Sequence, residues 1–199
     1  MKKKTRNKHP FFDHYRQSWN YLVESRKFIF SVIALFFAFS LFGFFVPAPD
    51  FLDERIIEFI RNLVEKTRGM SYPELTGFIL FNNLKSSFFG MIYGALLGIF
   101  PVIAASANGY LLGFVASASV KSEGILVLWR LLPHGVFELP AIFISLGLGL
   151  KTGSFIFQKD KFKSLKAFFW NSFKVFVLIV IPLLIIAAVI EGTLISFFK

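Results

Sequence analysis

Two ionisable residues stand out because they lie four apart within an apolar stretch of the sequence. His134 and Glu138 would share one face of a helix at that spacing. Such a pair can neutralise charges between helices, carry protons or ions, or bind zinc together with a third ligand. Other polar residues among apolar neighbours extend the set to a predicted polar cluster of Asn82, Asn83, Lys85, Asn108, Arg130, His134, Glu138 and Glu191.

The zinc alternative is weak, because the remaining histidines, His9 and His14, lie far away in a basic N-terminal segment. The chain contains no Cys, so it offers no thiolate metal site, cysteine nucleophile or disulfide. HExxH, Gly-rich phosphate-loop and nucleophile-elbow motifs are also absent from the sequence. We therefore expect no enzymatic activity, no catalytic residue, no cofactor and no metal.

The composition places these residues in a membrane. Hydrophobic residues make up 55% of the 199 positions, 29 of which are Phe, and the mean hydropathy is +0.65. The formal net charge of +10 is compatible with nucleic-acid binding, but the Lys and Arg residues lie between apolar blocks rather than on one face of a domain. We expect the lipid bilayer as solvent and no nucleic acid as partner.

The lengths of the apolar runs predict an all-α, polytopic transmembrane helix bundle of about five spans. Residues 28–48 form a run long enough to cross the hydrocarbon core. Residues 76–120 are too long for one span, and Pro101 is the expected turn. Pro133 suits the first turn of a later span. The predicted spans are residues 28–48, 76–100, 102–120, 133–157 and 171–198.

The charges of the connecting segments predict the orientation. The N-terminal segment 1–27 carries eight Lys or Arg residues against Asp13 and Glu24, and the loop before the last span is rich in Lys. The segment between the first two spans is acidic instead. By the positive-inside rule, residues 1–27 are cytoplasmic and the five-span domain 28–199 ends outside a cell membrane. In this orientation the predicted polar cluster lies in the outer half, except for Asn108.

Two amphipathic stretches flank the first span. In the extracytoplasmic segment of about residues 50–69, Asp50 is the expected N-cap and Gly69 the end of a helix. We favour a connector that packs against the rest of the protein. The alternatives are a helix that lies on the membrane surface, caps the bundle or docks a partner. The stretch 11–28 is expected on the inner leaflet. The apolar stripe of the outer helix comprises Leu52, Ile56, Phe59, Ile60 and Leu63.

A packing signal runs through the second predicted span. Gly90, Gly94 and Gly98 recur every fourth residue and so lie on one helix face. Small residues in such a row allow another helix to approach closely, and close packing drives helix association in lipid. The expected partner is the third or fourth predicted span of the same chain; another subunit, in a homo-oligomer, is the alternative.

At these positions the sequence resembles the stage II sporulation protein M family of small multi-span membrane proteins, and the resemblance extends from Tyr15 onward. It implies a five-span bundle without known enzymatic activity. In spore-forming bacteria the family member resembles a scaffold that holds a membrane protein and a cell-wall hydrolase at the septum. The matching residues are Asn82-Asn83, Gly90, Gly94, Gly98, Asn108-Gly109, Gly113, Pro133-His134-Gly135, Glu138 and Ala141-Ile142.

Two functions remain open from the sequence. The leading hypothesis is a non-enzymatic membrane scaffold that recruits membrane or cell-envelope proteins, because packing signals are abundant and no catalytic constellation is present. The alternative is a transporter or channel component, for a solute, a peptide or protons, that uses the polar cluster around His134 and Glu138.

Overall fold

The computed structural model describes residues 10–197, except for the side chains of residues 10, 11, 129–135 and 137. The first nine residues of the predicted basic segment, and Phe198 of the predicted last span, lie outside this part of the chain. The described residues are helical and contain no strand. Their α-helices are α1 (Pro10–Glu24), α2 (Arg26–Phe45), α3 (Asp50–Thr67), α4 (Tyr72–Ile92), α5 (Ile99–Glu123), α6 (Leu132–Gly153), α7 (Lys161–Val175) and α8 (Ile181–Phe197).

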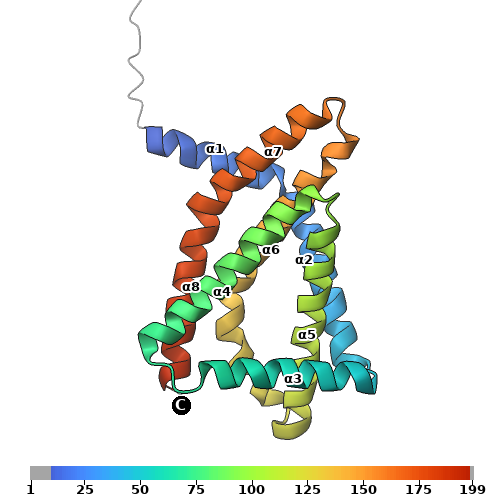
Figure 1. The fold of residues 1–199 in the computed structure, drawn as a ribbon, viewed down its shortest axis with the longest axis vertical. Coiled ribbons are helices and arrows are strands. Elements are labelled where there is room, and N and C mark those ends of the chain that lie inside the picture. The colour runs from blue at the N-terminus through green and yellow to red at the C-terminus, as the bar shows by residue number, and fades with distance from the viewer. Residues whose placement is uncertain (1–9, 198–199) are drawn as a thin grey trace, which may run out of the picture.

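Helix α6 is the centre of the bundle. It packs against α2 and α5 on one side and against α4 and α8 on the other (Figure 1). Its residues belong to both main apolar cores, with Ala141 and Leu148 in one and Phe143 and Leu146 in the other. Of its apolar segment 56% is buried, against 17–33% in the other candidate spans, so the remaining helices arrange themselves around α6.

Four helical segments are long and apolar enough to cross a membrane: Arg26–Phe45, Ile99–Glu123, Glu138–Phe157 and Lys161–Phe197. The all-α fold with membrane-spanning helices is therefore confirmed. The predicted span of residues 76–100 corresponds to α4, which is not among the four. Two Asn residues, Lys85 and two Ser residues lower the hydropathy of this helix, which nevertheless lies alongside α8 and α6.

The turn between the second and third predicted spans comes earlier in the chain than Pro101, the predicted position. The chain reverses at residues 96–98, where Leu97 and Gly98 adopt left-handed φ angles of 57° and 72°. Pro101 is instead the third residue of α5, where a missing N–H costs nothing because the first turn of a helix has no intrahelical acceptor for it. A proline near a turn thus marked the start of a helix and not the turn itself.

The last helix begins earlier than predicted. Instead of starting near Asn171, the helical segment starts at Lys161 and runs through a π-helical turn, Phe176–Val180, into α8. Pro182 lies two residues after this turn. Because proline has no backbone N–H, it cannot donate to the carbonyl one helical turn earlier, and the π-helical turn and a bend accommodate it. Helix α7 leans away from α8 at this point (Figure 1).

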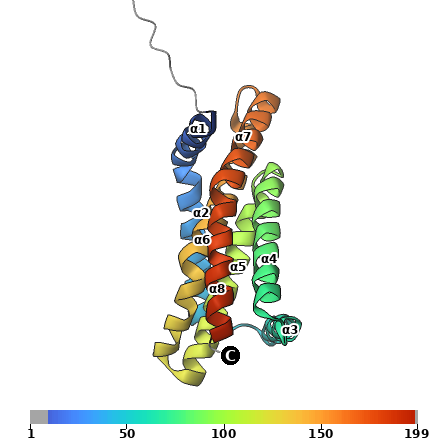
Figure 2. The same cartoon turned by 90° about the vertical axis from the view of Figure 1, so that its left-hand side faces the viewer.

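Helix α3 runs across the long helices near one end of the bundle (Figure 1) and lies on one side of it, below α4 (Figure 2). It confirms the helix predicted near residues 50–69, and Gly69 ends it with a φ of 82°. Asp50 is not its N-cap, because Pro49 occupies that position and Asp50 is the first helical residue. None of its residues is fully buried, and Leu52, Ile56 and Ile60 are half-buried.

Glycines bring the helix backbones into contact. A Cβ on Gly109 of α5 would collide with the backbone carbonyl of Phe36 in α2, and a Cβ on Gly113 would collide with that of Ser40. Gly94 meets the backbone of Gly149 in the same way. Gly77 of α4, by contrast, has open space around it.

We predict that Gly109→Ala destabilises the protein by roughly 1–3 kcal/mol, because the added methyl group must push α2 and α5 apart. The matched control is Gly77→Ala, which should be neutral or stabilise by up to about 1 kcal/mol through helix propensity. Thermal unfolding in detergent measures both. Equal melting temperatures for the two variants would contradict the observed crossing of α2 and α5.

Candidate functional site

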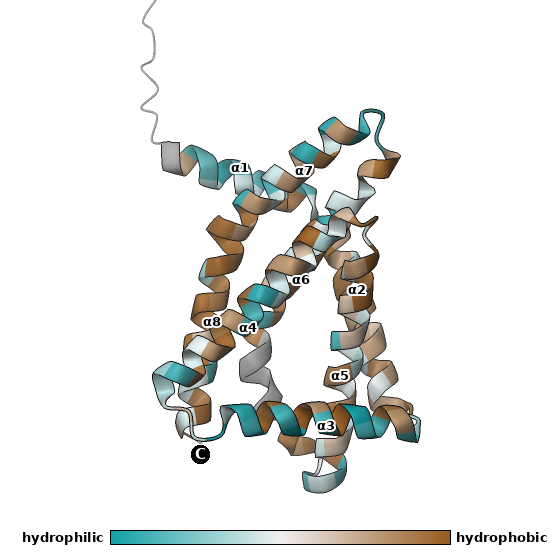
Figure 3. Ribbon diagram, viewed as in Figure 1, coloured by the Kyte–Doolittle hydropathy of each residue, from teal (hydrophilic) through white to brown (hydrophobic). Residues whose placement is uncertain are grey.

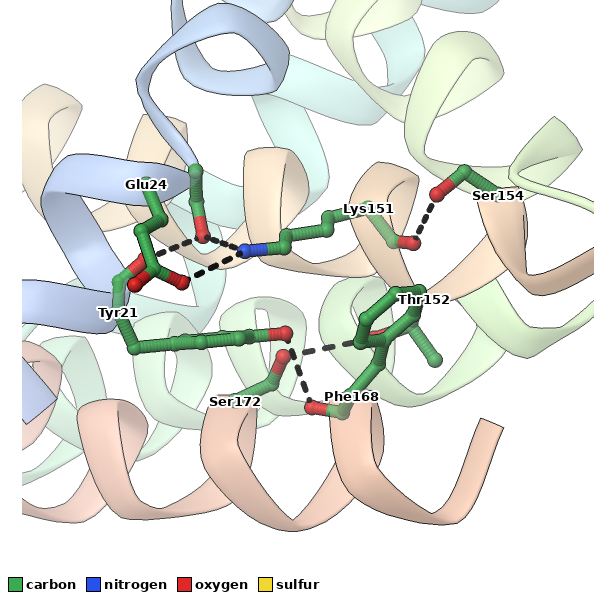
Figure 4. Close-up of polar contacts among 8 residues, drawn as sticks. Tyr21, Glu24, Lys151, Thr152, Ser154, Phe168 and Ser172 are labelled. Atoms are coloured by element: carbon green, nitrogen blue, oxygen red, sulfur yellow. Dashed lines mark hydrogen bonds and ion pairs between the residues drawn. The ribbon is translucent and has the colours of Figure 1, made fainter. Parts of the chain in front are cut away.

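A buried lysine joins three elements at the end of the bundle where α1 lies. Lys151, near the end of α6, is 8% exposed. Its ammonium donates to the Ser25 hydroxyl over 3.1 Å and lies 4.0 Å from the Glu24 carboxylate. It also stands 3.7 Å from the centre of the Tyr21 ring, within cation–π range (Figure 4). We call Tyr21, Glu24, Ser25, Lys151, Thr152 and Ser172 the Lys151 cluster.

Ser25 sits at the corner between α1 and α2. Its hydroxyl donates to the Tyr21 carbonyl over 2.6 Å and accepts from Lys151, so both of its hydrogen-bonding capacities are used. The side chain is fully buried. Because α2 begins directly after it, the bond from Lys151 to this hydroxyl attaches the corner between α1 and α2 to α6.

Helix α7 is attached to the same cluster. The Tyr21 hydroxyl donates to the Phe168 carbonyl over 3.3 Å, and the hydroxyls of Thr152 and Ser172 lie 3.4 Å apart (Figure 4). Burial raises the pKa of Tyr21 to about 12, so the phenol remains a hydrogen-bond donor at physiological pH. The cluster therefore ties α1, α6 and α7 together and leaves little of Lys151 to solvent.

We did not predict this cluster from the sequence, because Lys151 lies close to the lysine-rich loop before the last span and was interpreted with those lysines as a signal of orientation. A signal for it exists in the sequence. Lys151 is the only charged residue between Glu138 and Lys159, and an isolated charge in such an apolar stretch usually has partners within the protein.

Four members of the predicted polar cluster meet at the opposite end of the bundle. Asn82 and Asn83 of α4, Glu138 of α6 and Glu191 of α8 line a cavity of about 310 Å³ beneath α3. We call it the α3 cavity. The rest of its wall is mainly apolar and comprises Leu63, Val64, Thr67, Leu75, Phe78, Ile79 and Ile195.

The other members are placed differently. Lys85 is exposed on α4. Asn108 donates to the Ala104 carbonyl of its own helix over 2.8 Å and does not line the α3 cavity. The side chains of Arg130 and His134 lie outside the described residues, although their backbones belong to the 3₁₀ segment Ile125–Leu131 and to α6. Within the described residues, no three His, Asp or Glu side chains are grouped so as to hold a metal ion.

The glycine row packs against α6. A Cβ on Gly90 would meet the Leu146 side chain, and one on Gly98 would meet Leu150 at 2.9 Å. Gly94 lies in a 3₁₀ turn, Tyr93–Ala95, and Gly98 lies beyond it, so the row does not belong to one continuous α-helix. The role of these glycines is therefore close approach between α4, the following turn and α6.

Long apolar helices around α6, with polar groups gathered at the two ends of the bundle, define an α-helical membrane protein. The family model of stage II sporulation protein M matches residues 32–194, and the chain belongs to this family. No curated protein and no solved structure matches the chain. The match covers α3, α6 and every residue that lines the α3 cavity except Ile195, and it begins after α1 and the Tyr21–Ser25 part of the Lys151 cluster.

We predict that Lys151→Met loosens α1. The change removes the hydrogen bond that the charged ammonium donates to Ser25, worth roughly 1.5–3 kcal/mol, and so should speed amide hydrogen exchange across residues 12–24 about tenfold or more. Lys163→Met, at an exposed position of α7, is the matched control and should leave exchange unchanged. Identical exchange in the two variants would show that the Lys151 cluster does not hold α1.

Proposed function

We propose that this chain is a non-enzymatic membrane scaffold that assembles other membrane or cell-envelope proteins. The observation that carries the proposal is α3, an 18-residue helix with no buried residue that lies across one end of the bundle. Its charged residues form a surface that the chain's own fold does not use. Membership of the stage II sporulation protein M family supports the proposal.

The polar contacts of the Lys151 cluster agree with such a role. They connect α1, α6 and α7 and are directed at other residues of the chain. In a scaffold, such contacts keep helices in a fixed arrangement while exposed surfaces engage partners. Those partners are membrane or envelope proteins. A second copy of this chain is one such membrane protein, so the class of partners includes a homo-oligomer.

We further propose five spans in a cell membrane, with a cytoplasmic N-terminus and an extracytoplasmic C-terminus. Helix α1 and the lysine-rich start of α7 lie at one end of the bundle, whereas α3 and the end of α8 lie at the other (Figure 1). Counting α4 as a span follows from its position alongside α6 and α8. An odd number of spans then places the two termini on opposite sides.

The natural absence of Cys allows a direct test of this topology. In intact cells, a membrane-impermeant maleimide should label Glu65→Cys in α3 and should reach Lys161→Cys only after the cells are opened. Both positions are exposed, so folding should not be affected. Labelling of both variants from the same side would overturn the five-span arrangement.

The scaffold role is tested by photo-cross-linking from α3 in native membranes. A photoreactive residue at Glu58 or Arg61, both exposed, should give discrete adducts with the same partner protein. The control is Ile103, an exposed side chain in the candidate span of α5, which should give no such adduct. Absence of protein adducts from both α3 positions would contradict the proposal.

A transporter or channel component is the second candidate, favoured by the four polar residues that line the α3 cavity. Purified chain in liposomes decides between the two. Proton or solute flux that falls several-fold in Glu138→Gln would support the second candidate and contradict a purely structural scaffold. Flux equal to that of empty liposomes would remove it.

A further inference from the structure

Helix α3 carries an apolar face that the bundle covers only in part. Exposed side chains of this face are Phe59 at 54%, Leu63 at 41% and Val64 at 59%. Its sequence alternates apolar and charged residues at helical spacing, which Figure 3 shows as alternating colours along the helix. An amphipathic helix needs an apolar environment for such a face, so something other than this chain must supply it.

The apolar face is turned toward the bundle. The half-buried residues Leu52, Ile56 and Ile60 recur every fourth position, which marks the side nearest the other helices. Leu63 and Val64 lie on the same side and line the α3 cavity. The exposed charged residues Glu54, Glu58, Arg61 and Glu65 lie on the opposite side of the helix by the same geometry and so face away from the bundle.

Short connections hold α3 at the ends of the long helices. Only residues 46–49 separate it from α2, and only residues 68–71 separate it from α4. Four residues span at most about 14 Å, whereas α3 itself is about 27 Å long. The helix therefore cannot leave this end of the bundle.

The lipid-facing surface of the bundle continues to the start of α3. Phe42 and Phe45 in the last turn of α2 are 52% and 73% exposed. In a membrane protein, such aromatic side chains at the end of a candidate span meet lipid. The apolar face of α3 starts at Leu52, seven residues further along the chain, and is turned toward the same layer.

We propose that α3 is an interfacial helix, with its apolar face inserted among the lipids of the leaflet at this end and its charged face in water. A protein partner would have to slide between α3 and the membrane to reach the apolar face, whereas lipid is already there. The inference extends beyond the scaffold role and does not depend on it, because it requires only that the chain lies in a membrane.

Burial of apolar side chains drives this insertion, and attraction to acidic lipid does not. Helix α3 has five acidic residues against three basic ones, whereas helices that bind through anionic lipids are rich in Lys and Arg. The depth of insertion should therefore be the same in liposomes of phosphatidylcholine with and without phosphatidylglycerol. The five acidic residues are Asp50, Asp53, Glu54, Glu58 and Glu65; the three basic residues are Arg55, Arg61 and Lys66.

Spin labels on single cysteines in the full chain test the proposal in these liposomes. Labels at Phe59→Cys and Val64→Cys should be reached several-fold better by oxygen, which concentrates in lipid, than by a water-soluble nickel chelate. Labels at Glu58→Cys and Arg61→Cys on the charged face should show the reverse. Ile103→Cys, in the candidate span of α5, is the reference for full lipid exposure.

Each other outcome overturns the proposal. Apolar-face labels that the nickel chelate reaches as readily as the charged-face labels would place α3 in water. Apolar-face labels hidden from both reagents would show that protein covers the face, either this bundle or a second copy. Failure of the photo-cross-linking experiment would remove the scaffold role and leave these accessibilities unchanged, so the two proposals can fail separately.

Discussion

The close approach of α6 to its neighbours is the contact on which the rest of the structure depends. Lipid gives helices no hydrophobic reason to associate, so packing distance and polar contacts decide whether they stay together. Backbone atoms of Gly94 and Gly98 meet Gly149 and Gly153 of α6, where no side chain intervenes. Both apolar cores contain residues of α6, so separation of these backbones would remove packing contacts from both cores.

Helix α6 also determines where the ionisable groups lie. Glu138 and Lys151 are about 20 Å apart along its axis, and each points to a different end of the bundle. A small rotation or shift of α6 would therefore disturb the α3 cavity and the Lys151 cluster together. Because both sites depend on one helix, the glycine contacts that fix α6 are as important for these sites as the polar residues themselves.

Much of the fold could be predicted from the lengths of the apolar runs in the sequence. The two polar sites could be predicted only in part. The run that became α2 and the stripe that became α3 needed only local periodicity. Pro101 misled because proline suits a turn and the first turn of a helix equally well. Asn82, Asn83, Glu138 and Glu191 could be grouped by depth alone, whereas the partners of Lys151 lie more than 100 residues away and no local pattern links them.

The two amphipathic helices illustrate two ways of fixing a surface helix. Helix α1 is held by specific bonds, since Tyr21 and Ser25 reach α7 and α6, and this attachment requires a buried cation and a corner serine. Helix α3 has no buried residue, and short connections at both ends restrict it instead. In the proposed interfacial position, lipid takes up its apolar face, which then needs no matching groove in the bundle.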